Sequence, residues 1–232
     1  MSSSSRIDAS EANLEDLKSW FCASSSDYRL PFRPGPDLER LTLSDKRKQL
    51  IEIVKQYGLT HSAEPVRLAS GEYSRDFVDA KAALAEGGNL QLACEALIEL
   101  ADQAGIRWDA VGGLTMGADQ FAHVAAVIAK KRWFVVRKER KGRGTDKLVE
   151  GAPLDASVRV LLVDDVVTTG GSIRQAYEAT RGTGAVVAGA VTLVDRGEVA
   201  GAYFAAEAIP YRPLVTYADL NIDPVGGGLI NA

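Results

Sequence analysis

The sequence predicts an α/β protein built on a central, mostly parallel sheet flanked by helices. Short, continuous apolar runs at residues 133–136, 160–163 and 186–194 are typical of strands that are buried on both faces. Segments whose apolar residues recur at helical spacing alternate with these runs. This alternation of strands and helices favours a parallel sheet whose two faces are covered by helices.

The first helix of the predicted domain follows residue 43. Ser44 is a suitable N-cap and Gly58 a suitable end. Short extended pieces at residues 66–68 and 77–79 come next, before a second helix over 89–104 that Gly105 ends. The apolar stripe of the first helix is Leu50, Ile51, Val54 and Tyr57, and that of the second is Leu90, Ala93, Leu97, Leu100 and Ala101.

The later elements alternate more regularly. Ala110 and Val111 lead as a strand into a Gly-Gly turn, and residues 119–130 form a helix. After the strands at 133–136 and 160–163, a helix over 172–181 precedes the strand at 186–194.

The chain divides into a main domain and two terminal segments. Residues 1–40 are rich in Ser, Pro and Gly around one helical stretch at 11–21, so we expect a partly disordered N-terminal extension. Residues 41–225 form the predicted domain, and residues 226–232 form a frayed tail.

The composition excludes several classes of protein. The chain has 232 residues, of which 46% are hydrophobic and 25% charged, close to the globular average. A net charge of −4 gives no electrostatic reason to expect a nucleic acid or an anionic membrane as partner. Cys22, Cys94, His61 and His123 form no disulfide framework and no zinc pattern. No apolar stretch has the length of a membrane span and Met1 opens no signal peptide, so we expect a cytoplasmic protein.

The most informative segment is residues 160–172. An apolar strand delivers Asp164 and Asp165 to its carboxyl end, where α/β ligand sites lie. A turn rich in hydroxyl groups and glycine follows and opens a helix, whose N–H groups can bind a phosphate. Two adjacent carboxylates can accept hydrogen bonds from a diol or help to hold a divalent cation. A ribose that carries a phosphate satisfies both halves of this segment.

Each half of the segment is common by itself, since many strands end in an acid and many Gly-Gly pairs are simple turns. Their joining through Thr168 and Thr169 is what favours a site. The segment is neither a Walker A loop nor a GxGxxG motif.

A cationic segment separates two of the predicted strands. Residues 138–155 contain Lys138, Arg140, Lys141, Arg143 and Lys147, and the part over 138–147 has no apolar side chain. Such a segment is either a linker or a mobile functional loop, and its position between two core strands favours the loop.

Residues 163–172 resemble the phosphoribosyl-pyrophosphate (PRPP) motif of the type I phosphoribosyltransferases, and the chain is most similar to their orotate branch over about residues 44–219. The resemblance implies the type I phosphoribosyltransferase fold with a small hood. It extends to four further segments, namely 68–71 with Ser74 and 77–79 (hood), 111–118 (pyrophosphate loop), 134–144 (catalytic loop) and 194–196 (the strand end whose arginine holds the orotate carboxylate).

The resemblance also implies residue roles, in which the acids hold the ribose hydroxyls, the turn holds the 5-phosphate and the loop cations close over the pyrophosphate. The implied PRPP-binding residues are Arg137, Lys138, Lys141, Arg143, Asp164, Asp165, Val166, Val167, Thr168, Thr169, Gly170, Gly171 and Ser172. The implied catalytic residues are Lys138, Lys141, Arg143 and Asp165, and the implied orotate-binding residues are Thr168 and Arg196. The resemblance further implies Mg²⁺ carried by PRPP without a firm protein ligand, and a homodimer in which the loop reaches the neighbouring subunit.

Three positions depart from the family pattern. Arg143 stands where the catalytic loop usually has a histidine, and arginine cannot shuttle a proton near neutral pH. Met116 and Ala69 stand where many members have lysine. The leading hypothesis is orotate phosphoribosyltransferase; a type I enzyme for another base and a non-catalytic PRPP-binding regulator are the alternatives.

Overall fold

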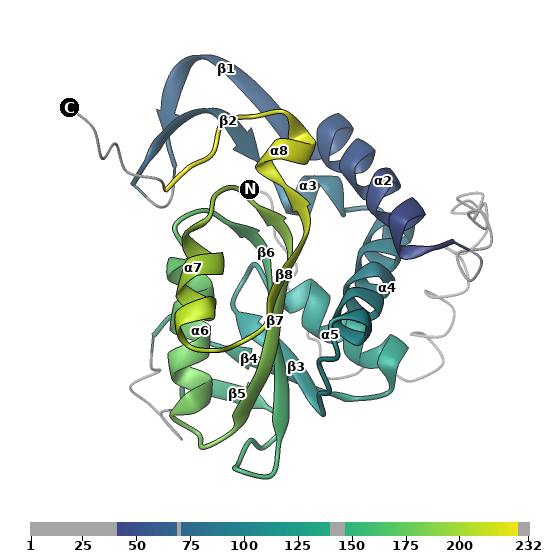
Figure 1. Ribbon diagram of the computed structural model, residues 1–232, viewed down its shortest axis with the longest axis vertical. Helices are drawn as coiled ribbons and strands as arrows, with labels where there is room; N and C mark the ends of the chain where they lie inside the picture. The colour runs from purple at the N-terminus through teal and green to yellow at the C-terminus, as the bar shows by residue number, and fades with distance from the viewer. Residues whose placement is uncertain (1–40, 69–70, 140–146, 227–232) are drawn as a thin grey trace, which may run out of the picture. The chain divides into compact units, whose positions relative to one another are not determined.

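A computed structural model describes residues 41–68, 71–139 and 147–226 of the chain (Figure 1). The six strands of its main sheet lie in the order β5-β4-β3-β6-β7-β8, in which only the β4–β5 pair is antiparallel. The predicted mostly parallel α/β sheet is therefore confirmed. The predicted extension over 1–40, including its helical stretch, lies outside the described residues.

The strands expected at 110–111, 133–136, 160–163 and 186–194 are present as β3, β4, β6 and β7, whereas β5 and β8 were not expected. A separate two-stranded antiparallel sheet, β1-β2, forms the hood, and its strands are longer than the extended pieces expected at 66–68 and 77–79. The bounds of all the strands are β1 Leu59–Arg67, β2 Tyr73–Val78, β3 Ala110–Leu114, β4 Arg132–Val136, β5 Val149–Gly151, β6 Arg159–Val167, β7 Val186–Asp195 and β8 Tyr211–Thr216.

The helices cover both faces of the main sheet, with α2, α4 and α5 on one face and α6 and α7 on the other (Figure 1). Their bounds are α2 Leu43–Ile53, the π-helix η2 Val54–Gly58, α3 Ala80–Ala83, α4 Gly87–Gln103, α5 Asp119–Ala129, α6 Gly171–Arg181, α7 Val199–Ala206 and α8 Tyr217–Leu220.

The core consists of two apolar layers that the sheet separates. Along β6, Leu161 and Val163 pack into the layer under α4 and α5, whereas Val160 and Leu162 pack into the layer under α6 and α7. Because successive side chains of a strand point to opposite faces, a strand covered on both sides must be apolar throughout. This explains why the central strands are continuous apolar runs.

Several local predictions need correction. The Gly112-Gly113 pair is part of β3 and not a turn, since the neighbouring strands approach too closely for side chains there. Asp164 and Asp165 likewise lie within β6, whose ladder with β7 continues to Val167. Extended pairing thus holds both acids in fixed directions.

Other corrections concern the helix starting at Leu43 and the cationic loop. Thr42, not Ser44, is the N-cap of α2, and its side-chain oxygen accepts a hydrogen bond from the Asp45 N–H. Tyr57, expected in the apolar stripe, is 55% exposed. It lies in the π-helix η2, whose wider turn departs from the α-helical spacing on which the stripe was predicted. Strand β5 interrupts the predicted loop over 138–155 and pairs with β4.

Substitution of Gly113 tests the close packing of β3 against its neighbours beneath the site. A Cβ added at this position would lie 2.1 Å from the carbonyl oxygen of Val163 and 2.6 Å from the Cβ of Ala118. We expect Gly113→Ala to lower the free energy of unfolding by about 1–3 kcal/mol, measured by denaturant titration. Gly88→Ala is the control, because a Cβ there meets nothing within 4 Å and alanine favours the helix. Equal stability of the two variants would contradict this account of β3.

Candidate active site

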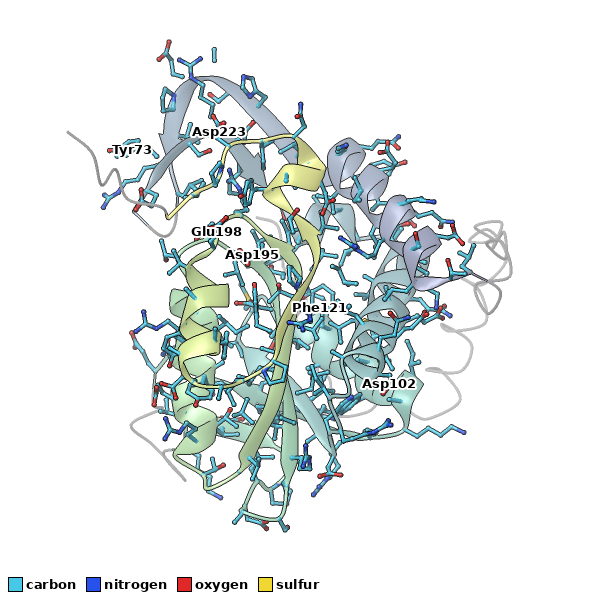
Figure 2. All side chains as sticks on the ribbon, in the orientation of Figure 1. Tyr73, Asp102, Phe121, Asp195, Glu198 and Asp223 are labelled. Carbon is cyan, nitrogen blue, oxygen red and sulfur yellow. The ribbon has the colours of Figure 1, made fainter. Side chains whose placement is uncertain are left out.

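The acid pair lies at the carboxyl end of β6, beneath the hood. Figure 2 shows Asp195, at the corresponding end of β7, and nearby Glu198 at the end of the sheet that faces the hood. Parallel strands bring their carboxyl ends to one edge of a sheet, and this edge is where α/β proteins bind ligands.

Local hydrogen bonds hold the two carboxylates. The Asp165 N–H donates to Asp164 Oδ1 at 3.0 Å, and the Val166 N–H donates to Asp165 Oδ1 at 2.7 Å. Lys81 donates from Nζ to Asp165 Oδ2 at 3.2 Å. Asp164 Oδ2 is buried and has no hydrogen-bond partner among the described residues. An acceptor with this geometry is available to a hydroxyl donor such as a sugar.

The acid pair also has unusual electrostatics. Burial, and next the negative charge of Asp165, raise the pKa of Asp164 to about 8. Burial disfavours the charged form of a carboxyl, and a like charge adjacent to it acts in the same direction. The free protein therefore holds a proton on Asp164 at neutral pH.

The turn after β6 presents backbone donors. Gly170 has a φ of +77°, a left-handed conformation that glycine adopts without strain, and it is the N-cap of α6. No side chain caps this helix, whose first residues, Gly171 and Ser172, are exposed. The first turn of α6, together with the hydroxyl groups of Thr168 and Thr169, can therefore accept an anion.

Arg196 follows β7 and is 1% exposed. Its Nη1 donates to the carbonyl oxygen of Asp76 at 2.7 Å and its Nη2 to Ser74 Oγ at 3.1 Å, which ties the main sheet to the hood strand β2. Its Nε is buried without a partner among the described residues. Burial lowers the pKa of this guanidinium, and the nearby Asp76 charge raises it.

A second network fixes the end of β7. Asp195 Oδ1 accepts a hydrogen bond from the Gly197 N–H at 3.0 Å, and Asp195 Oδ2 accepts one from the Tyr211 hydroxyl at 2.8 Å. Since these bonds flank Arg196 in the chain, they restrict the direction in which its side chain leaves the strand.

The cationic loop is described only at its two ends. Lys138 is exposed, and its carbonyl oxygen accepts a hydrogen bond from Gln175 Nε2 on α6 at 2.8 Å. Arg137 pairs with Glu150 on β5 at 3.0 Å. Lys141 and Arg143 lie outside the described residues.

One cavity of about 730 Å³ brings most of the predicted site residues together. It is lined from the hood, α3, β6, α6 and the loop end, and Arg137 is not part of its lining. The predicted residues that line it are Lys138, Asp164, Asp165, Val166, Val167, Thr168, Thr169, Gly170, Gly171, Ser172 and Arg196.

Lys81 and Gln175 also line the cavity, and neither was predicted from the sequence. Lys81 reaches an acid that is 84 positions away in the chain, and Gln175 reaches a carbonyl 37 positions away. Their spacing carries no signal for these contacts, because only the folded chain brings the partners together.

The cavity offers limited ligands for a metal ion. The described residues contain no group of three or more His, Cys, Asp or Glu side chains that could hold one. The free oxygen of Asp164 and the Asp165 carboxylate fit a divalent cation only when a bound substrate supplies the remaining oxygens.

Comparison with known proteins defines the class to which this fold and site belong. Residues 82–202 match the model of the phosphoribosyl transferase domain. The orotate phosphoribosyltransferase of Corynebacterium glutamicum is 37% identical over 183 residues, which cover 78% of this chain and 96% of that relative. The corresponding relative from Methanothermobacter thermautotrophicus is 34% identical over 175 residues, covering 75% of this chain and 94% of the relative.

A solved structure agrees with these relatives. The Mycobacterium tuberculosis orotate phosphoribosyltransferase in complex with PRPP superimposes with a TM-score of 0.61 at 33% identity, covering 76% of this chain and 99% of that chain. The chain thus belongs to the phosphoribosyltransferases and, among them, to the orotate phosphoribosyltransferase family. The resemblance seen in the sequence is confirmed.

Among the described residues, no helix combines the length and the apolar character needed to cross a membrane.

The raised pKa of Asp164 predicts a pH dependence of stability. The folded state holds a proton on Asp164 that the unfolded chain loses near pH 3.8. Protonation of Asp164 therefore stabilises the folded state at low pH, and this stabilisation is lost as the pH rises through about 8. In buffer without Mg²⁺ or PRPP, we expect Asp164→Asn to gain at least about 1.4 kcal/mol of unfolding free energy relative to the wild type between pH 5 and pH 9.

Asp155→Asn is the control for this measurement. A hydrogen bond from Ser157 lowers the pKa of Asp155, which therefore titrates below the range tested. A relative gain of the same size in this variant would show that the effect does not come from burial of Asp164.

Proposed function

We propose that the protein transfers the 5-phosphoribosyl group of PRPP to orotate, forming orotidine 5′-phosphate and pyrophosphate, and that this reaction serves pyrimidine biosynthesis. The observation that carries the proposal is that one cavity joins a buried acid pair, an uncapped helix start and a buried guanidinium. These three groups complement a diol, a phosphate and a carboxylate.

The ribose phosphate fits the β6–α6 half of the cavity. Asp164 Oδ2 has no partner among the described residues, and Asp165 Oδ2 is held by a half-exposed lysine. Both oxygens can therefore exchange hydrogen bonds with the ribose hydroxyls, Asp164 Oδ2 as a donor while it is protonated and as an acceptor once it is ionised. The 5-phosphate would then lie at the start of α6, where backbone N–H groups and the helix dipole stabilise an anion.

The carboxylate of orotate fits Arg196. A buried guanidinium is costly without a charged partner, and an anionic base supplies a charge that a neutral base does not. Arg196 keeps its Nε available while two other nitrogens bind the hood. This arrangement supports a specificity for a carboxylate-bearing base.

The chemistry is a displacement at the anomeric carbon. The bond between this carbon and the pyrophosphate oxygen breaks, the bond to a ring nitrogen of orotate forms, and positive charge develops on the ribose as in glycoside hydrolysis. Negative charge accumulates on the departing pyrophosphate, so cations and exclusion of water stabilise the transition state. Lys138 at the cavity, with Lys141 and Arg143 in the same loop, would provide these charges.

Mg²⁺, carried by PRPP, would neutralise part of the pyrophosphate charge. The acid pair would orient the ribose hydroxyls toward it.

We also propose a cytoplasmic homodimer. An exposed patch of His123, Val127 and Trp133 supports the homodimer: the His123 and Trp133 rings lie 4.6 Å apart edge to face, and Val127 is 77% exposed one helical turn further along α5. Apolar side chains gathered in this way are typical of surfaces that another subunit covers.

A base-selectivity assay tests the proposed function. The protein is incubated with PRPP and Mg²⁺ together with orotate, uracil, hypoxanthine or adenine, and calorimetry measures PRPP binding in parallel. We expect consumption of orotate only. Turnover of another base would favour a related transferase, and PRPP binding without any turnover would favour a regulator.

Arg196→Gln tests the orotate site. We expect kcat/KM for orotate to fall about 10- to 100-fold through the loss of a charged hydrogen bond, while the Kd of PRPP stays within about threefold. Ser74→Ala is the control, because it removes one hood contact of Arg196 and leaves the guanidinium in place. A parallel loss of PRPP affinity would show that Arg196 acts on the whole cavity and not on the base.

Lys138→Ala tests the loop. We expect kcat to fall about 10²- to 10³-fold, as for removal of one donor that stabilises a developing charge, with less than a tenfold change in the Kd of PRPP. Lys147→Ala is the matched control at the other end of the loop, since Lys147 does not line the cavity. A wild-type kcat in Lys138→Ala would exclude this role.

A further inference from the structure

Lys81 lines the cavity, and the reaction proposed above assigns no role to its positive charge. It lies on α3, directly after hood strand β2, and its backbone N–H donates to Asp79 Oδ1 at 3.0 Å. Its Nζ pairs with Asp165 Oδ2 at 3.2 Å. The side chain of Lys81 is 56% exposed, whereas that of Asp165 is 12% exposed. A backbone hydrogen bond therefore holds the main chain of Lys81, and its ammonium group reaches the acid pair from a half-exposed side chain.

The same carboxylate contacts the loop after β3. A Cβ added at Gly117 would lie 2.6 Å from Asp165 Oδ1 and 2.8 Å from Asp164 Oδ1, so this loop passes directly against the acid pair. The segment that resembles a pyrophosphate loop, residues 111–118, contains no Lys or Arg, and Met116 in it is 72% exposed. An anion that binds here finds no positively charged side chain in the loop itself.

The other cations of the described cavity lining lie elsewhere. Arg196 is buried between β7 and the hood, and Lys138 is held beside α6 through the bond of its carbonyl oxygen to Gln175. Lys81 is the remaining cation of this lining. It pairs with the Asp165 carboxylate, which Gly117 also approaches. Lys81 is therefore paired with a carboxylate that lies directly against the segment without a positive charge.

Resting on the proposed function, we propose that Lys81 binds the pyrophosphate end of PRPP and supplies the cation that residues 111–118 lack. In the free protein its ammonium group pairs with Asp165. When the ribose hydroxyls bind to that carboxylate, they compete for the same oxygen, Oδ2, and Lys81 turns to the adjacent pyrophosphate. A half-exposed ion pair is weak enough to exchange in this way, and the lysine stem is long enough to follow the charge.

The test compares two ligands that differ only in the pyrophosphate group. Calorimetry with Mg²⁺ measures the Kd of PRPP and of ribose 5-phosphate for the wild type, Lys81→Met and Lys81→Gln. We expect both variants to lose about 10- to 100-fold in PRPP affinity, the effect of one charged hydrogen bond, and to bind ribose 5-phosphate within threefold of the wild type. Lys48→Met is the matched control, because Lys48 is an exposed lysine that pairs with one aspartate, Asp45, on α2.

The reverse reaction provides an independent readout. Lys81→Met should raise KM for pyrophosphate and leave KM for orotidine 5′-phosphate within threefold, since only the first ligand carries the group that Lys81 binds.

Three results would overturn the inference. Unchanged PRPP affinity would show that Lys81 contacts no part of the pyrophosphate. Equal losses for PRPP and ribose 5-phosphate would show that Lys81 only holds Asp165 in position. If the wild type binds PRPP and consumes orotate, either of these two results overturns the role of Lys81 and leaves the proposed function standing. A wild type that fails to bind PRPP would overturn the proposed function and this inference together.

Discussion

The burial of two adjacent carboxylates at the end of β6 is the constraint on which the rest of the site depends. A charged group in a protein interior is unfavourable unless hydrogen bonds and opposite charges compensate for it. Here the next backbone N–H along the chain bonds each carboxylate, Lys81 pairs with Asp165, and Asp164 retains a proton. One oxygen of Asp164 stays unpartnered among the described residues. In the free protein, part of the free-energy cost of burying these carboxyl groups is therefore not compensated. A ligand with hydroxyl groups would compensate for it by hydrogen bonding to the unpartnered oxygen. The same burial explains why the loop nearest the acids has glycine at position 117.

Arg196 connects this site to the hood. Through Asp76 and Ser74, its guanidinium holds strand β2 against the end of β7, and Asp76 in turn contacts His61 Nδ1 at 2.9 Å on the outer hood strand. Because the arginine is buried, its direction is set by these contacts and by the Asp195 network, and it does not adjust freely to a ligand. In the proposed reaction, a base that lacks an anionic group would leave the buried Nε of Arg196 without a charged partner. The selectivity proposed for this cavity would then follow from a fixed cation, and the same side chain contacts the hood.

The sequence supported a prediction of the fold class, the order of the main elements and the acid pair with its glycine turn. These features depend on local signals, namely apolar runs, helical spacing and a short motif. It did not predict β5 or β8, because β5 has three residues and β8 carries Pro213 within a short apolar run. The Gly-Gly pair in β3 was taken for a turn because its requirement for glycine comes from neighbouring strands. Lys81 was missed for a similar reason, since its partner lies 84 positions away. Local chemistry can be predicted from sequence, whereas contacts across the fold cannot be predicted from one chain.

The arrangement of charges also bears on the loop arginine that departs from the family pattern. Neither histidine lines the cavity among the described residues: His61 lies on the hood, paired with Asp76, and His123 packs against Trp133. The site therefore gathers cations around a central acid pair, and no imidazole lines its described part. Pyrophosphate leaves as an anion, so its departure requires compensation of charge more than delivery of a proton. Arg143 can supply that charge at any physiological pH, which makes its replacement of a histidine compatible with the proposed reaction.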